Sequence, residues 1–204
     1  FSSKTDAARL RAACVGKTAV VRTVERKERT ERPPKLYDLT TLQREANRLF
    51  GYTAQQTLDY AQLLYEKKLA TYPRTDSRYL VSGMEAGLTA LCGTVSAALS
   101  LPLVESPEAG QVINDSKVSD HHALLPTAEL GRADLATLPT GERNVLTLIA
   151  ARLLCAVGSP CRYAESAAVL ECGGASFTPN GRTMREGGGE AAEQVVVAGN
   201  KKRA

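Results

Sequence analysis

The sequence has 204 residues, of which 43% are hydrophobic and 24% are charged, and its net charge is +4. This length and composition are typical of a globular protein with one large domain or two small ones. No apolar run approaches the roughly 18 residues of a membrane span, and no signal peptide is apparent, so we expect no membrane partner. The positive charge permits an anionic partner but does not identify one.

The cysteines exclude two further classes of protein. They show no C-x-x-C spacing, which argues against a zinc site. Their odd number and scattered positions fit reduced thiols in a cytoplasmic protein better than a disulfide framework. The five are Cys14, Cys92, Cys155, Cys161 and Cys172.

The first part of the chain predicts a short helix followed by a strand. Ser3-x-x-Asp6 is a helix start signal and Gly16 is a stop signal. Residues 18–24 are small or β-branched and predict a strand. Residues 25–32 are dense in charges of both signs, and we expect a solvated extended arm there rather than a nucleic-acid-binding patch. Pro33-Pro34 then marks a domain boundary.

The middle of the chain predicts helices. Thr40-x-x-Gln43 and Thr53-x-x-Gln56 are capping-box patterns, and Gly51 separates them. Two helices joined by so short a turn are either a plain αα-hairpin or a helix-turn-helix. Further helices are expected after Ser82-x-x-Glu85 and after Thr140. The apolar face expected for the second helix comprises Ala54, Leu58, Ala61, Tyr65 and Leu69.

The last part returns to strand character. Residues 164–171 and 175–178 flank Gly173-Gly174, which predicts a hairpin turn. A last strand is expected at 193–197 and a disordered basic tail at 200–204. The sequence therefore predicts an α+β fold: a mainly helical domain over 36–158, inserted into a small β-rich domain made of 1–35 and 159–204.

One segment, residues 69–80, holds an unusual set of reactive groups. Pro73 biases Tyr72 toward extended backbone, where side chains two residues apart point to the same side. Tyr72 and Arg74 could then converge on one point. A free phenol has a pKa near 10, and a nearby cation favours its ionised form. A guanidinium can also hold a phosphate with two hydrogen bonds. The alternative is a loop tyrosine stacked on its neighbours among solvated charges.

Four motifs in order resemble the type IA DNA topoisomerases, most closely the topoisomerase III branch. They are LYDLTTLQREAN at 36–47, TLDYAQLLYE at 57–66, LATYPRTDSRYL at 69–80 and DHHALLPT at 120–127. The resemblance covers roughly residues 1–180 and implies a helix-turn-helix-like unit beside the catalytic tyrosine. It also implies that the β-rich domain acts as a hinged arch. Since the chain begins without Met, we expect a central fragment of a longer enzyme.

The resemblance implies roles for individual residues. Tyr72 matches the nucleophile, which attacks single-stranded DNA, forms a 5′-phosphotyrosine and later reseals the strand without ATP. Arg74 matches the arginine that stabilises the phosphate. Of the chain's two histidines, His121 matches the family histidine, and His122 is the weaker candidate. Because adjacent histidines point apart, we expect no metal site at this pair. Weaker candidates for DNA contact are Gln56, Thr57, Thr75, Asp76 and Ser77, whereas Tyr37, Tyr65 and Tyr79 are expected to be structural.

The resemblance also implies what must come from elsewhere. The family binds Mg²⁺ through an acidic cluster in a Toprim domain, and this sequence has no D-x-D pattern to supply it. We therefore expect Mg²⁺ only in the complete enzyme, single-stranded DNA and the other domains as partners, and an inactive isolated fragment in the cytoplasm, associated with the nucleoid. Two alternatives stay open: a non-catalytic helix-turn-helix module that binds DNA, and a structural arm whose tyrosine is buried.

Overall fold

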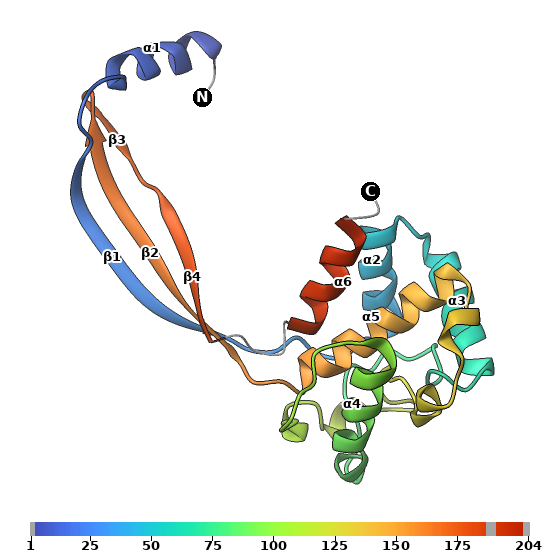
Figure 1. Ribbon diagram of the computed structural model, residues 1–204. Helices are drawn as coiled ribbons and strands as arrows, with labels where there is room; N and C mark the ends of the chain where they lie inside the picture. The colour runs from blue at the N-terminus through green and yellow to red at the C-terminus, as the bar shows by residue number, and fades with distance from the viewer. Residues whose placement is uncertain (1–2, 187–190, 202–204) are drawn as a thin grey trace. The chain divides into compact units, whose positions relative to one another are not determined.

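The computed structural model describes residues 3–186 and 191–201, and these form two compact units (Figure 1). A sheet unit contains the chain up to Glu31 and again from Cys161 to Glu186. A helical unit contains Arg32–Pro160 and the last described helix. Within the described residues, no helix has the length and apolar character needed to cross a membrane.

The sheet unit is built around one central strand. Strand β2 (Cys161–Cys172) pairs antiparallel with β1 (Val20–Glu31) along one edge, and with β3 (Ala175–Phe177) and β4 (Asn180–Glu186) along the other. The register of β1 on β2 runs from Val20 opposite Glu171 to Glu31 opposite Cys161. Helix α1 (Lys4–Cys14) precedes β1. The expected mixture of helix and sheet is therefore confirmed.

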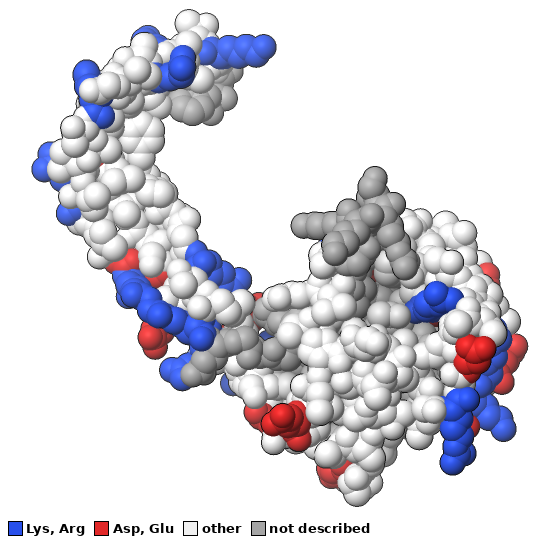
Figure 2. All heavy atoms as spheres, in the orientation of Figure 1, with Lys and Arg blue, Asp and Glu red and all other residues white. Residues whose placement is uncertain are grey.

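Strand β1 bears out the prediction of a solvated extended segment at 25–32, but it shows that the predicted strand at 18–24 ended too early. The charged stretch continues the strand to Glu31, and every residue of β1 is exposed. Ion pairs between the strands explain why so polar a segment can pair: Arg22 lies 2.7 Å from Glu171, and Arg29 lies 3.1 Å from Glu165. In Figure 2, Lys and Arg side chains accordingly lie along this sheet.

The turn between β2 and β3 is the predicted hairpin at Gly173-Gly174. Both glycines have positive φ, +58° and +80°, which suits a tight two-residue turn. A Cβ on Gly173 would lie 2.3 Å from the carbonyl oxygen of Ala13 at the end of α1, so glycine is also needed for close packing. Ser3 accepts from Asp6 N and caps α1 at the predicted start signal, and none of the residues of α1 is buried.

The helical unit contains five α-helices among the described residues, and α5 is its centre. Eleven of the 17 residues of α5 are buried, which leaves this helix almost no solvent face. The α-helices are α2 (Leu39–Phe50), α3 (Ala54–Glu66), α4 (Glu85–Leu99), α5 (Thr140–Ala156) and α6 (Ala191–Lys201). Short 3₁₀ turns are η1 (Ala109–Gln111), η2 (Asp115–Lys117), η3 (Ala128–Gly131) and η4 (Leu135–Thr137).

The caps of α2 and α3 decide where these helices begin. The predicted Thr53–Gln56 capping box of α3 is confirmed. For α2 the predicted cap, Thr40, was two residues too late: Asp38 is the cap, and its Oδ1 accepts hydrogen bonds from Thr41 N at 2.6 Å and Thr41 Oγ1 at 2.7 Å. A carboxylate accepts two donors at once, and so it competes well for the N-terminal position.

The predicted starts of α4 and α5 were also displaced. Ser82 N and Oγ donate to the carboxylate of Asp115 at 2.7 and 2.6 Å, so this serine is not free to cap α4, which begins at Glu85. Thr140 is the first residue of α5 and not its cap. In α3 the buried residues are Thr57, Ala61 and Leu64, so the predicted face was right for Ala61, and for Leu69 beyond the helix, but wrong for the exposed Ala54 and Tyr65.

The C-terminal segment is a helix and not the expected strand at 193–197. Its run of β-branched residues suggested a strand, but α6 packs against α5, and tertiary packing overrides a weak local preference. As a result α6 groups with the helical unit, although the sequence had suggested that everything after residue 159 joins the β-rich part. The end of the expected disordered tail, residues 202–204, lies outside the described residues.

Candidate active site

The segment that carries Tyr72 leaves α3 through a left-handed turn. Lys68 has φ +59°, and Leu69 N donates to the carbonyl of Leu64 at 2.8 Å, which closes the helix end. From Leu69 to Leu80 the chain is then without regular helix, as the Pro73 signal predicted. We call residues 69–80 the tyrosine segment.

A second segment, residues 121–127, holds the tyrosine segment in place. Thr71 N donates to the carbonyl of Leu125, and Leu125 N donates to Thr71 Oγ1, both at 2.9 Å. Ala123 N donates to the carbonyl of Tyr79 at 2.9 Å on the far side of Tyr72. We call residues 121–127 the histidine segment. Because it bonds on both sides of Tyr72, it fixes the position of the backbone that carries this phenol.

The ring of Tyr72 lies between two other rings. Its centroid is 4.6 Å from that of His121 with an interplanar angle of 53°, and 5.4 Å from that of Tyr65 at 74°. Tyr72 is half-buried, while Tyr65 and His121 are both exposed. Such edge-on contacts orient a ring while leaving part of it open to solvent. The sequence had not indicated that Tyr65 would support Tyr72 in this way.

Beside the histidine segment lies an open groove of about 460 Å³. Arg74 and His121 line it, and three carboxylates, Asp38, Asp76 and Asp120, also face it. Its remaining lining residues are Leu39, Thr40, Thr75 and Ser119. The groove thus contains a guanidinium able to bind a phosphate, together with acidic groups that repel one. Tyr72 is not among the lining residues, but its ring contacts His121, which is. The convergence of Tyr72 and Arg74 on one point stays a prediction.

Two predicted DNA-contact residues lie inside the protein. Thr75 and Ser77 are 6% and 4% exposed. Thr75 Oγ1 donates to the carbonyl of His121 at 2.9 Å and accepts from Ser77 N at 3.1 Å. Ser77 Oγ donates to the carbonyl of Lys117 at 2.8 Å. Both hydroxyls therefore bind backbone groups that shape the site.

The other predicted contact residues divide between helix α3 and the groove. Gln56 completes the cap of α3, where its Oε1 accepts from Thr53 N at 2.9 Å, and Thr57 is fully buried with Oγ1 donating to the carbonyl of Thr53. Asp76 is exposed in the groove. A role in DNA contact stays a prediction for each of the five. Asp38 and Asp120 were not selected from the sequence, although Asp120 stands directly before the histidine pair.

The second histidine has a different environment from the first. His122 is half-buried, and its Nδ1 lies 2.7 Å from the carbonyl oxygen of Ala123, which a protonated Nδ1 can bind. Among residues 3–186 and 191–201, no group of three or more potential metal ligands occurs. The two histidines therefore belong to different surroundings, and in the described residues they form no part of a metal cluster.

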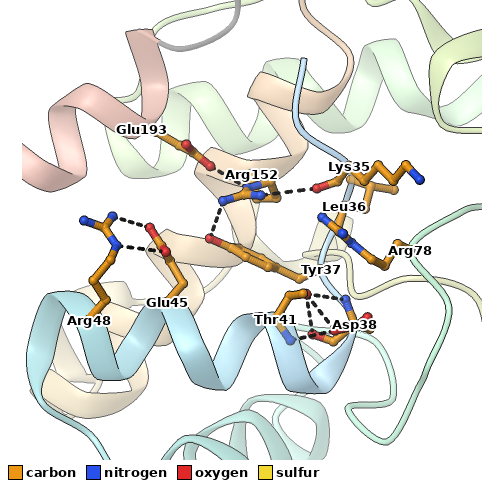
Figure 3. A network of polar contacts seen from close by, with 10 residues as sticks. All are labelled: Lys35, Leu36, Tyr37, Asp38, Thr41, Glu45, Arg48, Arg78, Arg152 and Glu193. Carbon is orange, nitrogen blue, oxygen red and sulfur yellow. Dashed lines mark hydrogen bonds and ion pairs between the residues drawn. The ribbon is translucent and has the colours of Figure 1, made fainter. Parts of the chain in front are cut away.

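A polar network around the buried Tyr37 lies next to Asp38, one of the residues that line the groove (Figure 3). Arg152 Nη2 donates to Tyr37 Oη at 2.9 Å, the guanidinium lies 4.1 Å from the centre of the Tyr37 ring, and Nε is 2.5 Å from Glu193 Oε1. Burial raises the pKa of Tyr37 above its usual range, so this phenol stays neutral. The carbonyl of Tyr37 accepts from Leu124 N at 2.9 Å. The network thereby fixes the backbone next to Asp38.

Comparison with known proteins decides the family. A family model described as DNA topoisomerase matches residues 1–198. The chain belongs to this family. DNA topoisomerase 3 of Bacillus subtilis (strain 168) is 38% identical over 183 residues, which cover 86% of this chain and 25% of that protein. DNA topoisomerase 3 of Bacillus licheniformis is 39% identical over 189 residues, which cover 89% of this chain and 26% of that protein. The expected resemblance to type IA, topoisomerase III-like proteins is confirmed.

A solved topoisomerase has the same fold. Full-length topoisomerase I from Thermotoga maritima superimposes with a TM-score of 0.65 at 24% identity, over 93% of this chain and 31% of that chain. The chain spans about a quarter of the length of the two Bacillus relatives named above.

Proposed function

We propose that Tyr72 is the nucleophile of a type IA DNA topoisomerase that cleaves and reseals single-stranded DNA. Tyr72 Oη attacks a backbone phosphorus and forms a 5′-phosphotyrosine, while the bond from phosphorus to the 3′ oxygen breaks. The proton of the phenol ends on that oxygen, which leaves as a 3′-hydroxyl. A strand passes through the gap, and the reverse attack reseals it. The new phosphodiester keeps the energy of the old one, so no nucleotide cofactor is consumed.

The observation that carries this proposal is the setting of the Tyr72 ring. It packs between Tyr65 and His121 on a backbone that is hydrogen-bonded on both sides, yet the residue is only half-buried. A nucleophile needs this combination, because the reacting oxygen must be oriented without being shut away from the substrate. Five of the other six tyrosines lack it, since their rings contact an arginine, two lysines or one another.

Arg74 and His121 are the proposed partners of Tyr72. Arg74 is exposed in the groove, where its planar fork can hold two phosphate oxygens and stabilise the charge that develops on them. His121 contacts the Tyr72 ring and also lines the groove, so it can donate a hydrogen bond to the same phosphate. Thr75 holds the backbone of His121 and acts as a positioning residue.

The described residues do not fit a catalytic metal site. They contain no group of three potential ligands, and one groove carboxylate, Asp38, is committed to capping α2. We propose that Mg²⁺ and its ligands belong to another part of the complete enzyme. By the same reasoning the proposed partners are single-stranded DNA and the other domains, and the proposed location is the nucleoid.

A non-catalytic helix-turn-helix module fits the structure less well. Helices α2 and α3 are joined by a short turn at 51–53, but α3, the helix that would enter a DNA groove, contains no Lys or Arg. It does contain Asp59 and Glu66, which would repel phosphates. We therefore do not propose duplex reading by this helix pair.

The decisive experiment compares Tyr72→Phe with Tyr65→Phe in the complete enzyme. Both changes remove one oxygen and keep the ring, so the two proteins share any effect on packing. A single strand labelled at its 3′ end is mixed with each protein and the reaction is quenched with detergent. We expect protein-linked label with Tyr65→Phe and none with Tyr72→Phe. An adduct in Tyr72→Phe, or label that becomes linked only from the 5′ end, would show that the assignment is wrong.

A further inference from the structure

Two lysines from distant parts of the chain meet over one aromatic ring. Lys35 Nζ lies 5.1 Å and Lys117 Nζ 5.2 Å from the centre of the Tyr79 ring. Lys35 and Lys117 are exposed and Tyr79 is half-buried. We call Lys35 and Lys117 the lysine pair.

The positive charge of this pair is not neutralised within the described protein. Among the ion pairs formed by residues 3–186 and 191–201, none involves Lys35 or Lys117. By contrast, Lys67 in the same unit lies 2.6 Å from Glu142. The hydrogen bond from Lys35, and the charge of both lysines, lower the pKa of the Tyr79 phenol, so the surroundings favour a negative oxygen at this point.

The lysine pair and Tyr79 adjoin the groove through all three of their segments. Lys35 stands three residues before Asp38, Tyr79 three residues after Asp76, and Lys117 two residues before Ser119. Asp38, Asp76 and Ser119 all line the groove. The backbone connections are fixed: Ser77 Oγ binds the carbonyl of Lys117, and Tyr79 accepts from the histidine segment. The pair is therefore held at a set distance from the groove and does not lie on a loose surface loop.

The backbone under Lys35 is also anchored from two directions. Arg78 Nε donates to the carbonyl of Leu36 at 3.0 Å, and Arg152 Nη1 donates to that of Lys35 at 3.4 Å. Figure 3 shows the side chain of Lys35 extending away from Arg152, so its amino group is left free of the buried network. The residue is fixed at its backbone and open at its charged end, as a contact for a mobile anion requires.

We propose that Lys35 and Lys117 together bind one backbone phosphate of the single-stranded DNA, immediately beyond the groove that contains Arg74. This inference rests on the proposed function, because it extends the path of the same strand. Two ammonium groups beside one ring attract the single negative charge of a phosphodiester and can donate N–H groups to its oxygens without reading a base.

The test measures salt dependence on the 204-residue chain as it stands, with a fluorescent oligothymidylate as the probe. The double variant Lys35→Gln/Lys117→Gln should bind about two- to fivefold more weakly per lysine removed at low salt. The slope of log K against log salt should shrink by about 0.7, as expected for one lost phosphate contact on a single strand. The matched control is Lys4→Gln/Lys17→Gln, which removes the same charge from exposed positions in the sheet unit.

Three outcomes are informative. A smaller slope in the Lys35/Lys117 variant alone supports the site. An unchanged slope, or an equal change in the control, overturns it. Inorganic phosphate, compared with chloride at equal ionic strength, should compete with the oligothymidylate for the wild type but not for the double variant, and equal competition would also refute the site. The nucleophile is tested by a separate readout, adduct formation in the complete enzyme, so failure of this inference is distinguishable from failure of the proposed function on which it rests.

Discussion

Replacing Thr75 with valine tests whether a buried hydroxyl sets the geometry of the active site. Valine has nearly the same shape, so the change removes hydrogen bonds and little else. Thr75 is 6% exposed, and its Oγ1 bonds the carbonyl of His121 and the N–H of Ser77. His121 in turn contacts the ring of Tyr72. The substitution therefore acts on Tyr72 only through the segment that supports it.

The expected cost follows from those two bonds. Ser77 N would be left buried without a partner, which costs about 1–3 kcal/mol, and the carbonyl of the exposed His121 would cost less because water can reach it. We expect a loss of about 2 kcal/mol in the free energy of unfolding, and a fall of roughly 4–8 °C in Tm for a protein of this size.

The assay combines denaturant unfolding of this chain with adduct formation by the complete enzyme carrying the same change. We expect adduct formation to fall even at temperatures where the variant is fully folded, because His121 loses its anchor. Thr89→Val on α4 is the control, since Thr89 is exposed and lies outside the site. If Thr75→Val unfolds like Thr89→Val and cleaves normally, the bond is not important and the positioning role is wrong.

Three further predictions use other features of the chain. Arg74→Ala should lower the cleavage rate of the complete enzyme by about a hundredfold with an unchanged unfolding curve, and Arg74→Lys should recover part of it; near-normal turnover would contradict the role. Gly141→Ala should destabilise the protein by about 1–3 kcal/mol, because the new Cβ would lie 2.3 Å from the Tyr60 ring. Gly93→Ala should stabilise it by about 0.5–1 kcal/mol, because a Cβ there would meet no atom of the surrounding residues within 4 Å. Equal shifts in Tm would refute this pair of predictions. Burial raises the pKa of the Cys92 thiol to about 11, so the contribution of the neutral thiol to stability should be complete below about pH 9 and lost as the pH rises through 11. Cys92→Ala should therefore reduce the fall in Tm at alkaline pH, which melting curves at a series of pH values would measure.

Much of the architecture could be predicted from local signals. The Thr53–Gln56 box, the left-handed Gly51 and the Gly173-Gly174 turn each depend on a few neighbouring residues, and the structure confirms them. The errors arose where a distant residue competed for a local signal. Ser82 was expected to cap a helix but binds Asp115, and the polar strand β1 exists because β2 supplies ion-pair partners.

The candidate site shows the same division. The motif identified Tyr72, Arg74 and His121, but nothing in local spacing could place the His121 ring 4.6 Å from Tyr72, because 49 positions of chain separate them. Hydroxyl residues were the hardest to judge. Thr75 and Ser77 looked like DNA contacts because of their position beside the tyrosine, yet both point at backbone groups. A polar residue in a motif can serve the fold as readily as the ligand.

The charges around the groove then constrain where a strand can lie. Asp76 and Asp120 line the groove together with Arg74, and a unit charge pair 4 Å apart at the protein surface interacts by about 4 kcal/mol. A phosphate placed among these carboxylates alone would be repelled, whereas one near Arg74 or over the lysine pair would be attracted. The backbone of a bound strand should therefore run past Arg74 and the lysine pair and not past Asp76 and Asp120. We expect these two carboxylates to face cationic groups from other parts of the complete enzyme. Under the proposed function, a chain with a net charge of only +4 would thus bind a polyanion at defined points.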